Sequence, residues 1–143
     1  SVNKQKLRQY LAAREIGRPQ DYGAVGDGVN DDTQAINDAL AAEKAIYLPR
    51  GVYRITGPIT MHYGNAILGM GDESVIQAQD TPLNENEVPP YTAEFNAIEI
   101  VEGYCIVENI KIVGGASALF LAGKVSPCVK NVIENVTIWD AQI

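Results

Sequence analysis

Histidine, cysteine and excess positive charge are all scarce in this sequence. Its 143 residues include one histidine, His62, and two cysteines, Cys105 and Cys128. A histidine-based metal site or a serine–histidine nucleophile system therefore has almost no residues from which to be built. The formal charge of −7, with 18 acidic residues against 11 basic ones, disfavours binding to nucleic acid and to anionic membranes. We predict no metal, no cofactor and no nucleic-acid partner.

Long apolar runs are also missing. No segment approaches the roughly 20 apolar residues that a membrane-spanning helix needs. The first residues, SVNKQKLRQYL, lack the apolar block of a secretory signal. We therefore predict no insertion into a membrane, and expect that any secretory signal has already been removed.

The cysteines and the histidine have structural interpretations. Cys105 and Cys128 each lie in an apolar, strand-like run, so buried reduced thiols are favoured over a disulfide, although their redox state stays open. His62 is predicted on the surface of a strand.

Two helices are predicted near the N-terminus. Residues 3–15, NKQKLRQYLAARE, are strong helix formers with Leu7, Tyr10 and Leu11 on one face, which predicts a short amphipathic helix. Residues 31–43 also have helical spacing, with acidic residues and threonine at their start.

From Ala45 onward the sequence consists of short runs of β-branched and aliphatic residues. Gly, Pro, Asn or Ser separates the runs, which is typical of strands joined by tight turns. The runs are AIYLP, VYRIT, AILGM, SVIQA, NAIEIV, CIVENIKIV, ALFLA and NVIENVTIW. Strands this short indicate a sandwich, a barrel or a solenoid, and an internal repeat would favour the solenoid.

A repeat of 26 residues is present. VENIKIVG, residues 107–114, aligns without a gap with IENVTIWD, residues 133–140. A period in the twenties is typical of one coil of a parallel β-helix, in which each coil buries its inner face by stacking on its neighbours. The alignment places Asn109 over Asn135. Asparagine tolerates the left-handed backbone of a coil corner, so we predict a hydrogen-bonded ladder of these two side chains.

The same register predicts a long loop. The interval from Asn65, in the turn GNAIL, to Asn109 exceeds one coil. We predict that Asn65 occupies the same corner and that the extra residues form a loop excursion over 79–95, which is polar and contains proline. Its glutamates are predicted to be solvated rather than to bind a cation: Glu85, Glu87 and Glu94.

The segment 21–40, DYGAVGDGVNDDTQAINDAL, is rich in glycine and aspartate. Its glycines allow turns with positive φ, and its aspartates can supply oxygens to the unpaired N–H groups at the start of the following helix. A phosphate cradle would need that helix end uncharged, and a calcium loop would need a closing glutamate that is missing. We predict a structural turn and cap, with an incidental cation site as the alternative. Its residues are Gly23, Gly26, Asp27, Gly28, Asp31 and Asp32.

This segment, followed by AIYLPRGVYRIT and AILGMGDESVI, resembles the start of the pectate-lyase-like parallel β-helix proteins. That group includes bacteriophage tailspikes, polysaccharide lyases and hydrolases, and alginate epimerases. The resemblance implies an all-β solenoid, specifically a right-handed, single-stranded parallel β-helix with an N-terminal capping helix. It divides the chain into a helix or neck over 1–20, a glycine-rich turn and capping helix over 21–44, and the first coils over 45–143.

The basic helix before the motif is similar to the neck of phage tailspikes, where three chains meet. The resemblance therefore implies a homotrimer, a bacterial polysaccharide as partner, and a location in the virion or outside the cell. About three coils would leave the last strand with an open edge, so we expect an N-terminal part of a larger protein. In this group the residues that act on sugars lie on later coils or between chains, so the chain alone is expected to be inactive.

The residues of this chain that could act on a sugar are few. The repeat places Glu108 and Glu134 on adjacent coils, where two carboxyl groups can act as acid and base on a glycosidic bond, or can simply be solvated. Trp139 points outward if Ile138 points inward. Together with Tyr91 it would offer a platform for stacking on a sugar, and a subunit contact is the alternative for the tryptophan.

Three functions are therefore open. The first is a tailspike or tail fibre that binds and degrades a bacterial surface polysaccharide. The second is a free-standing secreted polysaccharide lyase, hydrolase or epimerase. The third is a non-enzymatic β-helix that serves as a structural or adhesive spacer.

Overall fold

The computed structural model of the protein describes residues 16–79, 93–121 and 130–139. Within these ranges none of the helices is long and apolar enough to cross a membrane. The predicted neck helix and most of the predicted loop excursion lie outside the described residues. The elements in chain order are η1 (Pro19–Tyr22), β1 (Asp27–Asp31), α2 (Thr33–Glu43), β2 (Ala45–Leu48), β3 (Gly51–Ile55), β4 (Ile59–Met61), β5 (Ala66–Gly69), β6 (Ser74–Ala78), β7 (Ile98–Ile100), β8 (Ile106–Val113), β9 (Leu119–Leu121) and β10 (Val132–Trp139).

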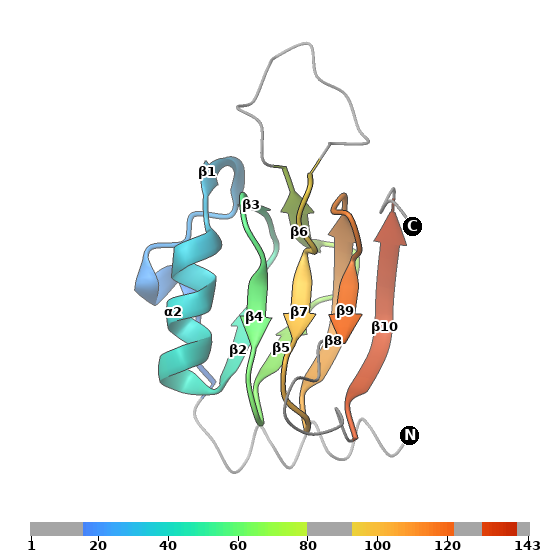
Figure 1. Ribbon diagram of the computed structural model, residues 1–143. Helices are drawn as coiled ribbons and strands as arrows, with labels where there is room; N and C mark the ends of the chain where they lie inside the picture. The colour runs from blue at the N-terminus through green and yellow to red at the C-terminus, as the bar shows by residue number, and fades with distance from the viewer. Residues whose placement is uncertain (1–15, 80–92, 122–129, 140–143) are drawn as a thin grey trace.

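The described strands form two sheets in which every pairing is parallel (Figure 1). The larger sheet has seven strands, and the smaller consists of β4, β7 and β9. The chain contributes β2 and β3 to the larger sheet and then β4 to the smaller one. The next three strands repeat this order: β5 and β6 join the larger sheet, and β7 joins the smaller one. The predicted all-β, parallel architecture is thus confirmed. A complete right-handed solenoid stays a prediction.

Strand β8 joins the two flanks of the larger sheet. Its first half pairs with β5, its second half pairs with β6, and both halves pair with β10. Asn109 lies between the halves with a φ of 57°, and Asn135 lies at the same point of β10 with a φ of 52°. The register of β8 and β10 is that of the sequence repeat, as in the pair Glu108 and Glu134. The larger sheet therefore curls at a corner formed by two asparagines.

The register one coil earlier differs from the prediction. The pairing of β5 with β8 places Asn65 level with Cys105 instead of Asn109. Gly69 is level with Asn109, and a Cβ added to Gly69 would lie 2.4 Å from the Asn109 carbonyl oxygen. The prediction was wrong because Asn65 precedes β5, whereas the corner at the level of Asn109 follows β5. Part of the insertion lies in the turn between β5 and β6, which is longer than the corner at Asn109.

Other parts of the chain cover the outer edges of β2, β3 and β4, the first strands of the stacked coils. Asn37 of α2 accepts a hydrogen bond from the Thr60 N–H at 3.0 Å and donates one to the Pro58 carbonyl at 3.2 Å, so the helix pairs with the β4 region. Gly17 exchanges two backbone hydrogen bonds with β2, and β1 pairs with β3. These contacts satisfy edge groups that would otherwise be open to another chain. Figure 1 shows α2 and β1 at one end of the molecule and β10 at the other.

The aspartates near the start of α2 act partly as predicted and partly otherwise. Asp31 accepts a hydrogen bond from the Thr33 N–H at 3.0 Å, at the first residue of the helix. Asp32, at the N-cap position, makes no capping hydrogen bond. Its carboxylate accepts from the backbone N–H groups of Val25 and Gly26, both at 2.9 Å. The prediction for Asp32 was wrong because the glycine-rich turn, not the helix, presents the donors nearest to its buried side chain.

The turn itself relies on positive φ angles and on one further carboxylate. Gly23, Gly26 and Gly28 have φ values of 104°, 72° and 75°. A Cβ at Gly26 would also lie 3.1 Å from the Tyr53 ring, so glycine is required there for conformation and for space. Asp27 accepts hydrogen bonds from the N–H groups of residues 29 and 30, and these bonds lower the pKa of Asp27.

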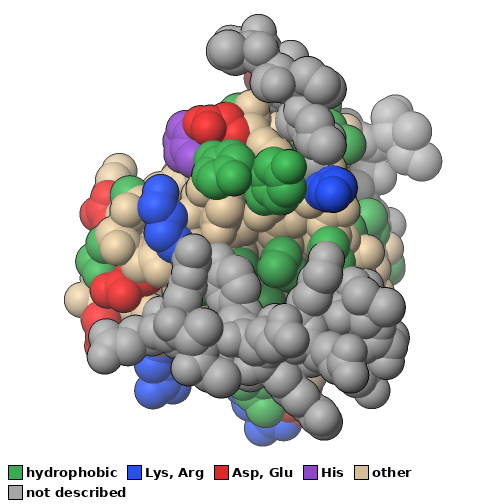
Figure 2. All heavy atoms as spheres, turned by 90° about the horizontal axis from the view of Figure 1, so that it is seen from below, with side chains coloured by type: hydrophobic (Ala, Val, Ile, Leu, Met, Phe, Trp, Pro, Cys, Tyr) green, Lys and Arg blue, Asp and Glu red, His purple; other side chains and the backbone are tan. Residues whose placement is uncertain are grey.

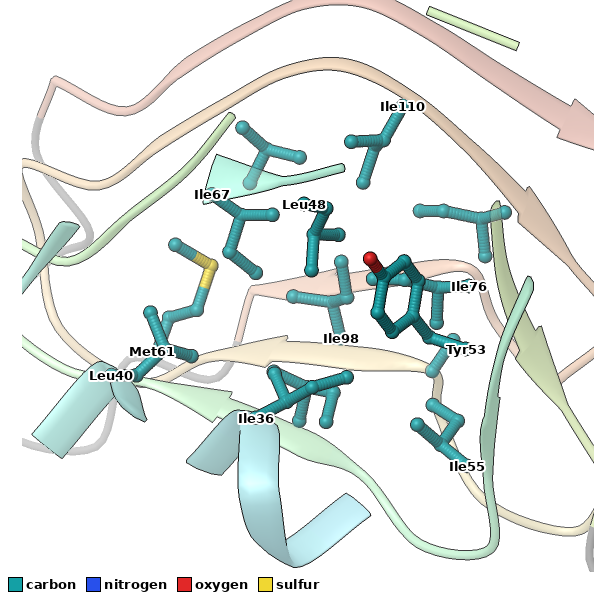
Figure 3. Close-up of a cluster of buried hydrophobic side chains, with 14 of the residues drawn as sticks. Ile36, Leu40, Leu48, Tyr53, Ile55, Met61, Ile67, Ile76, Ile98 and Ile110 are labelled. Carbon is teal, nitrogen blue, oxygen red and sulfur yellow. The ribbon is translucent and has the colours of Figure 1, made fainter. Parts of the chain in front are cut away.

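The hydrophobic core lies between the two sheets and against α2. Figure 3 shows Ile36 of the helix among side chains from strands of both sheets, including Tyr53, Ile76 and Ile98. All four are 0% exposed. Burial of an aliphatic side chain of this size contributes roughly 1.5–3 kcal/mol of transfer free energy. The Tyr53 hydroxyl is satisfied as well, because it donates to the Pro49 carbonyl at 2.8 Å.

Candidate functional site

Glu108 and Glu134 lie directly opposite each other on the neighbouring strands β8 and β10. Glu108 is only 5% exposed. Burial, and to a smaller extent the Glu134 carboxylate, raises the pKa of Glu108. The Oε2 atom of Glu134 is buried and has no hydrogen-bond partner within the described part of the chain. A carboxyl group with a raised pKa beside a second carboxyl group is the kind of pair that acid and base catalysis uses.

The surroundings of the glutamate pair explain its burial. On the other side of Glu108, the register of β5 and β8 places Leu68, which is 3% exposed. An apolar neighbour offers no hydrogen bond to a carboxylate and therefore favours the neutral form of Glu108.

The asparagine corner lies directly beside the pair in sequence. The Asn135 Nδ2 atom donates a hydrogen bond of 2.7 Å to the Asn109 Oδ1 atom, from one strand to the next. Both residues have the left-handed backbone noted above. This geometry gives the two asparagines a structural role at the bend.

Trp139 lies on the surface beyond that corner, with 45% of its area exposed. The Lys111 ammonium lies 5.0 Å from the centre of the Trp139 ring, a distance at which cation–π attraction operates. Next to them, the Thr137 hydroxyl donates to the Asp72 carboxylate at 2.6 Å. Ile138 pairs with the buried Ile112 but is itself 52% exposed. Trp139 of β10, the outermost described strand, and Lys111 of the neighbouring β8 thus form an amphipathic surface.

Several predicted residues cannot be placed. Tyr91, Glu85, Glu87 and Cys128 lie outside the described residues. Cys105 is buried, and its sulfur lies 3.1 Å from the His62 carbonyl oxygen. Across residues 16–79, 93–121 and 130–139, no three His, Cys, Asp or Glu residues are grouped in a way that could hold a metal ion.

The sequence interpretation missed a cavity on another face. It has a volume of about 380 Å³ and lies at the turn between β4 and β5. His62 belongs to this turn, immediately after β4, rather than to a strand as predicted. The available signal was a tyrosine in each of two stacked turns, Tyr63 in HYGN and Tyr104 in EGYC.

Comparison with known proteins gives partial similarities to much larger molecules. The chain is 36% identical over 67 residues to the pre-neck appendage protein of Bacillus phage B103, a match that covers 46% of this chain and 8% of the phage protein. It is 40% identical over 74 residues to the mannuronan C5-epimerase AlgE1 of Azotobacter vinelandii, covering 43% of this chain and 5% of the epimerase. The chain therefore spans less than a tenth of the length of these relatives.

A solved structure and a family model cover far more of the chain. The structure is the catalytic unit of a GH87 α-1,3-glucanase from Streptomyces thermodiastaticus strain HF3-3, with a TM-score of 0.57 at 22% identity. The match covers 88% of this chain and 22% of the glucanase, and it shows similarity of fold. The family model, described as rhamnogalacturonase A/epimerase, pectate lyase-like, matches residues 19–138. This range includes β1 to β9 and all of β10 except Trp139, and the chain belongs to the rhamnogalacturonase A/epimerase, pectate lyase-like family.

Proposed function

We propose that this chain is the N-terminal part of a longer protein of the phage tailspike type, which binds and degrades a bacterial surface polysaccharide. The observation that carries the proposal is the similarity of this chain to a phage pre-neck appendage protein. The chain itself belongs to a family named for a polysaccharide hydrolase and an epimerase. The names of the relatives also include an alginate lyase and a glucosidase. Action on polysaccharides is the property that these enzymes share.

The proposal includes a complete right-handed parallel β-helix in the longer protein. Two features support it. The outer edges of β2, β3 and the β4 region are already paired within the chain. At the other end, Ile138 on β10 stacks on the buried Ile112 and yet is half exposed. A further coil stacked on β10 would bury Ile138 and pair the edge of β10 that faces away from β8. The same coil would extend the outer surface on which Trp139 lies.

We propose that the catalytic residues of the longer protein lie outside this chain. Sugar cleavage needs two positioned acid and base groups, or a cation beside the scissile bond. Among the described residues the glutamate pair Glu108 and Glu134 is the arrangement nearest to this requirement, and Leu68 leaves it partly enclosed. We expect the chain alone to have no turnover.

An assay of reducing ends and of unsaturated products tests the proposal. The longer protein and this chain would be incubated separately with surface polysaccharides of candidate host bacteria. We expect products with the longer protein and none with the chain. Absence of products with the longer protein on every host glycan would instead favour a structural or adhesive β-helix.

A second function, a secreted polysaccharide-modifying enzyme, is favoured by the similarity to the bacterial epimerase and by the raised pKa of Glu108. If this chain carried the catalytic pair, it would release products by itself. Glu134→Gln would then abolish product formation, whereas Glu99→Gln, on a different sheet, would leave it unchanged.

A further inference from the structure

Two stacked turns line an open cavity near the end of α2. Residues 62–65 form the turn between β4 and β5, and residues 102–105 belong to the connection between β7 and β8. The cavity has a volume of about 380 Å³, within the range of roughly 300–1,000 Å³ that small-molecule sites occupy. It is lined by Lys44, His62, Tyr63, Gly64 and Glu102.

One exposed aromatic ring lines this cavity, and a second exposed ring packs against the first. Tyr63 lines it, and Tyr104 contacts Tyr63 edge to face, with ring centroids 5.2 Å apart and planes inclined at 65°. Their exposed fractions are 59% and 48%, so neither ring contributes mainly to the core. Figure 2 shows hydrophobic side chains gathered next to the histidine and an acidic side chain on this face. An inclined pair of rings offers a partner both a flat face and an adjoining wall.

Polar groups of both kinds lie beside the rings. The His62 Nδ1 atom is 3.2 Å from the Glu102 Oε1 atom, and the two side chains are 58% and 51% exposed. Lys44 adds an ammonium group to the lining. A carboxylate accepts hydrogen bonds and an ammonium donates them, so the cavity can pair with hydroxyl groups in either role.

The turns that carry these groups are held by their own hydrogen bonds. The His62 N–H donates to the Asn65 Oδ1 atom at 2.7 Å, and the His62 carbonyl accepts from the Asn65 N–H at 3.0 Å. The Gly64 N–H donates to the Gly103 carbonyl at 3.3 Å, which fixes one turn on the other. A site that is ordered before binding loses less conformational entropy when a ligand arrives.

We propose that this cavity binds a neutral hexopyranose unit of a polysaccharide. Tyr63 and Tyr104 present rings to the apolar C–H face of the sugar, and Glu102 and Lys44 hydrogen-bond its hydroxyl groups. In the cavity the Lys44 ammonium is offset by the Glu102 carboxylate, and the formal charge of −7 of the whole chain repels a polyanionic glycan, which favours a neutral sugar over a uronate. The cavity lies at the turns that precede β5 and β8, whereas Glu108 and Trp139 lie within strands β8 and β10. It would therefore be a separate point of attachment for the polysaccharide.

The inference deepens the proposed polysaccharide function but is tested independently of it. Isothermal titration calorimetry on this chain would use laminarihexaose as the neutral probe and an alginate hexasaccharide as the acidic one. We expect binding of the neutral probe, and affinity for the acidic probe at least about tenfold lower, which corresponds to 1.4 kcal/mol.

Substitutions localise the binding. Tyr63→Ala and Tyr104→Ala should each weaken binding of laminarihexaose by about tenfold or more, as truncation of a central aromatic contact does. Glu102→Gln should weaken it as well. Phe120→Ala is the control, because Phe120 is a comparably exposed ring, at 45%, on β9. Circular dichroism would confirm that each variant is folded.

The outcomes separate this inference from the proposed function. Absence of laminarihexaose binding at millimolar concentration, equal effects of Phe120→Ala and the tyrosine variants, or preference for the alginate probe would each overturn the inference. If the chain binds laminarihexaose through Tyr63 and Tyr104 while the longer protein degrades no glycan, the inference stands and the proposed function fails. If the longer protein degrades glycans but this chain binds neither probe, the reverse holds.

Discussion

The side chains of Asn109 and Asn135 are joined across two parallel strands by a hydrogen bond of 2.7 Å, and both residues have a left-handed backbone. This hydrogen bond links the two strands at the point where both bend. The two residues are 26 positions apart, so the sequence repeat corresponds to the stacking of β10 on β8.

Substitution of Asn135 separates the conformational contribution from the hydrogen bond. Asn135→Gly keeps access to positive φ and loses the amide, whereas Asn135→Ala loses both. We expect the alanine variant to be less stable than the glycine variant by about 1–2 kcal/mol, the typical cost of a left-handed backbone for a residue with a Cβ. Urea unfolding of the two variants measures the difference. Equal unfolding free energies would show that the corner backbone is not strained.

Asn65 should be among the least replaceable polar residues. It is 2% exposed, and its Nδ2 atom donates to the Leu40 and Lys44 carbonyls at 3.0 Å each, at the end of α2. Asn65→Ala removes the acceptor of the His62 N–H and one of the two donors to each carbonyl, while the Lys44 and Ala66 N–H groups still donate to them. We expect a loss of about 1–3 kcal/mol, the usual cost of one unsatisfied buried group.

Asn30→Ala is the matched control for that measurement, because Asn30 is exposed. Its effect should stay within about 0.5 kcal/mol, as is usual for surface substitutions. Similar unfolding free energies for the two variants would contradict the anchoring role of Asn65.

Glu108 should make stability depend on pH. Burial, followed by the Glu134 carboxylate, raises its pKa in the folded chain. Between the ordinary and the raised pKa, the folded chain keeps a proton that the unfolded chain loses, so this contribution to stability declines as pH rises through that window. Glu108→Gln should therefore be more stable than the parent chain above the window, and the difference should disappear below the ordinary pKa.

Thermal unfolding at a series of pH values measures this effect. Glu134→Gln, which removes the second cause of the shift, should reproduce part of the gain in stability. A gain for Glu108→Gln that is constant across the whole pH series would rule out titration of Glu108 as its origin.

The longer protein is expected to be a homotrimer. The motive is the amphipathic helix that the sequence predicts over residues 3–15, which would place Leu7, Tyr10 and Leu11 on one face. Light scattering at micromolar concentration should give three times the mass of one chain. Replacement of the three apolar residues by serine should reduce this to one. A monomer before substitution would favour the free-standing secreted enzyme.

Much of the architecture could be predicted from the sequence, because alternating β-branched residues and the 26-residue repeat report directly on strands and their stacking. Strand β1 (Asp27–Asp31) was not predicted, since DGVND has a turn composition and becomes a strand only by pairing with β3. The short β4 was missed because its three residues, ITM, follow a proline and are too few to show the alternation of apolar and polar residues that indicates a strand.

The candidate sites divide in the same way. The repeat predicted that Glu108 and Glu134 would be neighbours, since a register of whole coils fixes which residues meet. The cavity was missed although a tyrosine occurs in each of the two turns, Tyr63 and Tyr104, because the insertion between them hides that these turns stack. The role of Asp32 was equally hidden, since its choice between the helix and the turn depends on the folded position of Val25 and Gly26.

The most direct test of the account is the molar mass of a host surface polysaccharide before and after incubation with the longer protein. Size-exclusion chromatography with light scattering measures it without assuming hydrolysis or elimination. We expect a progressive fall in molar mass with the longer protein and no change with this chain alone. An unchanged molar mass with the longer protein, on a polysaccharide to which it binds, would contradict a degradative function.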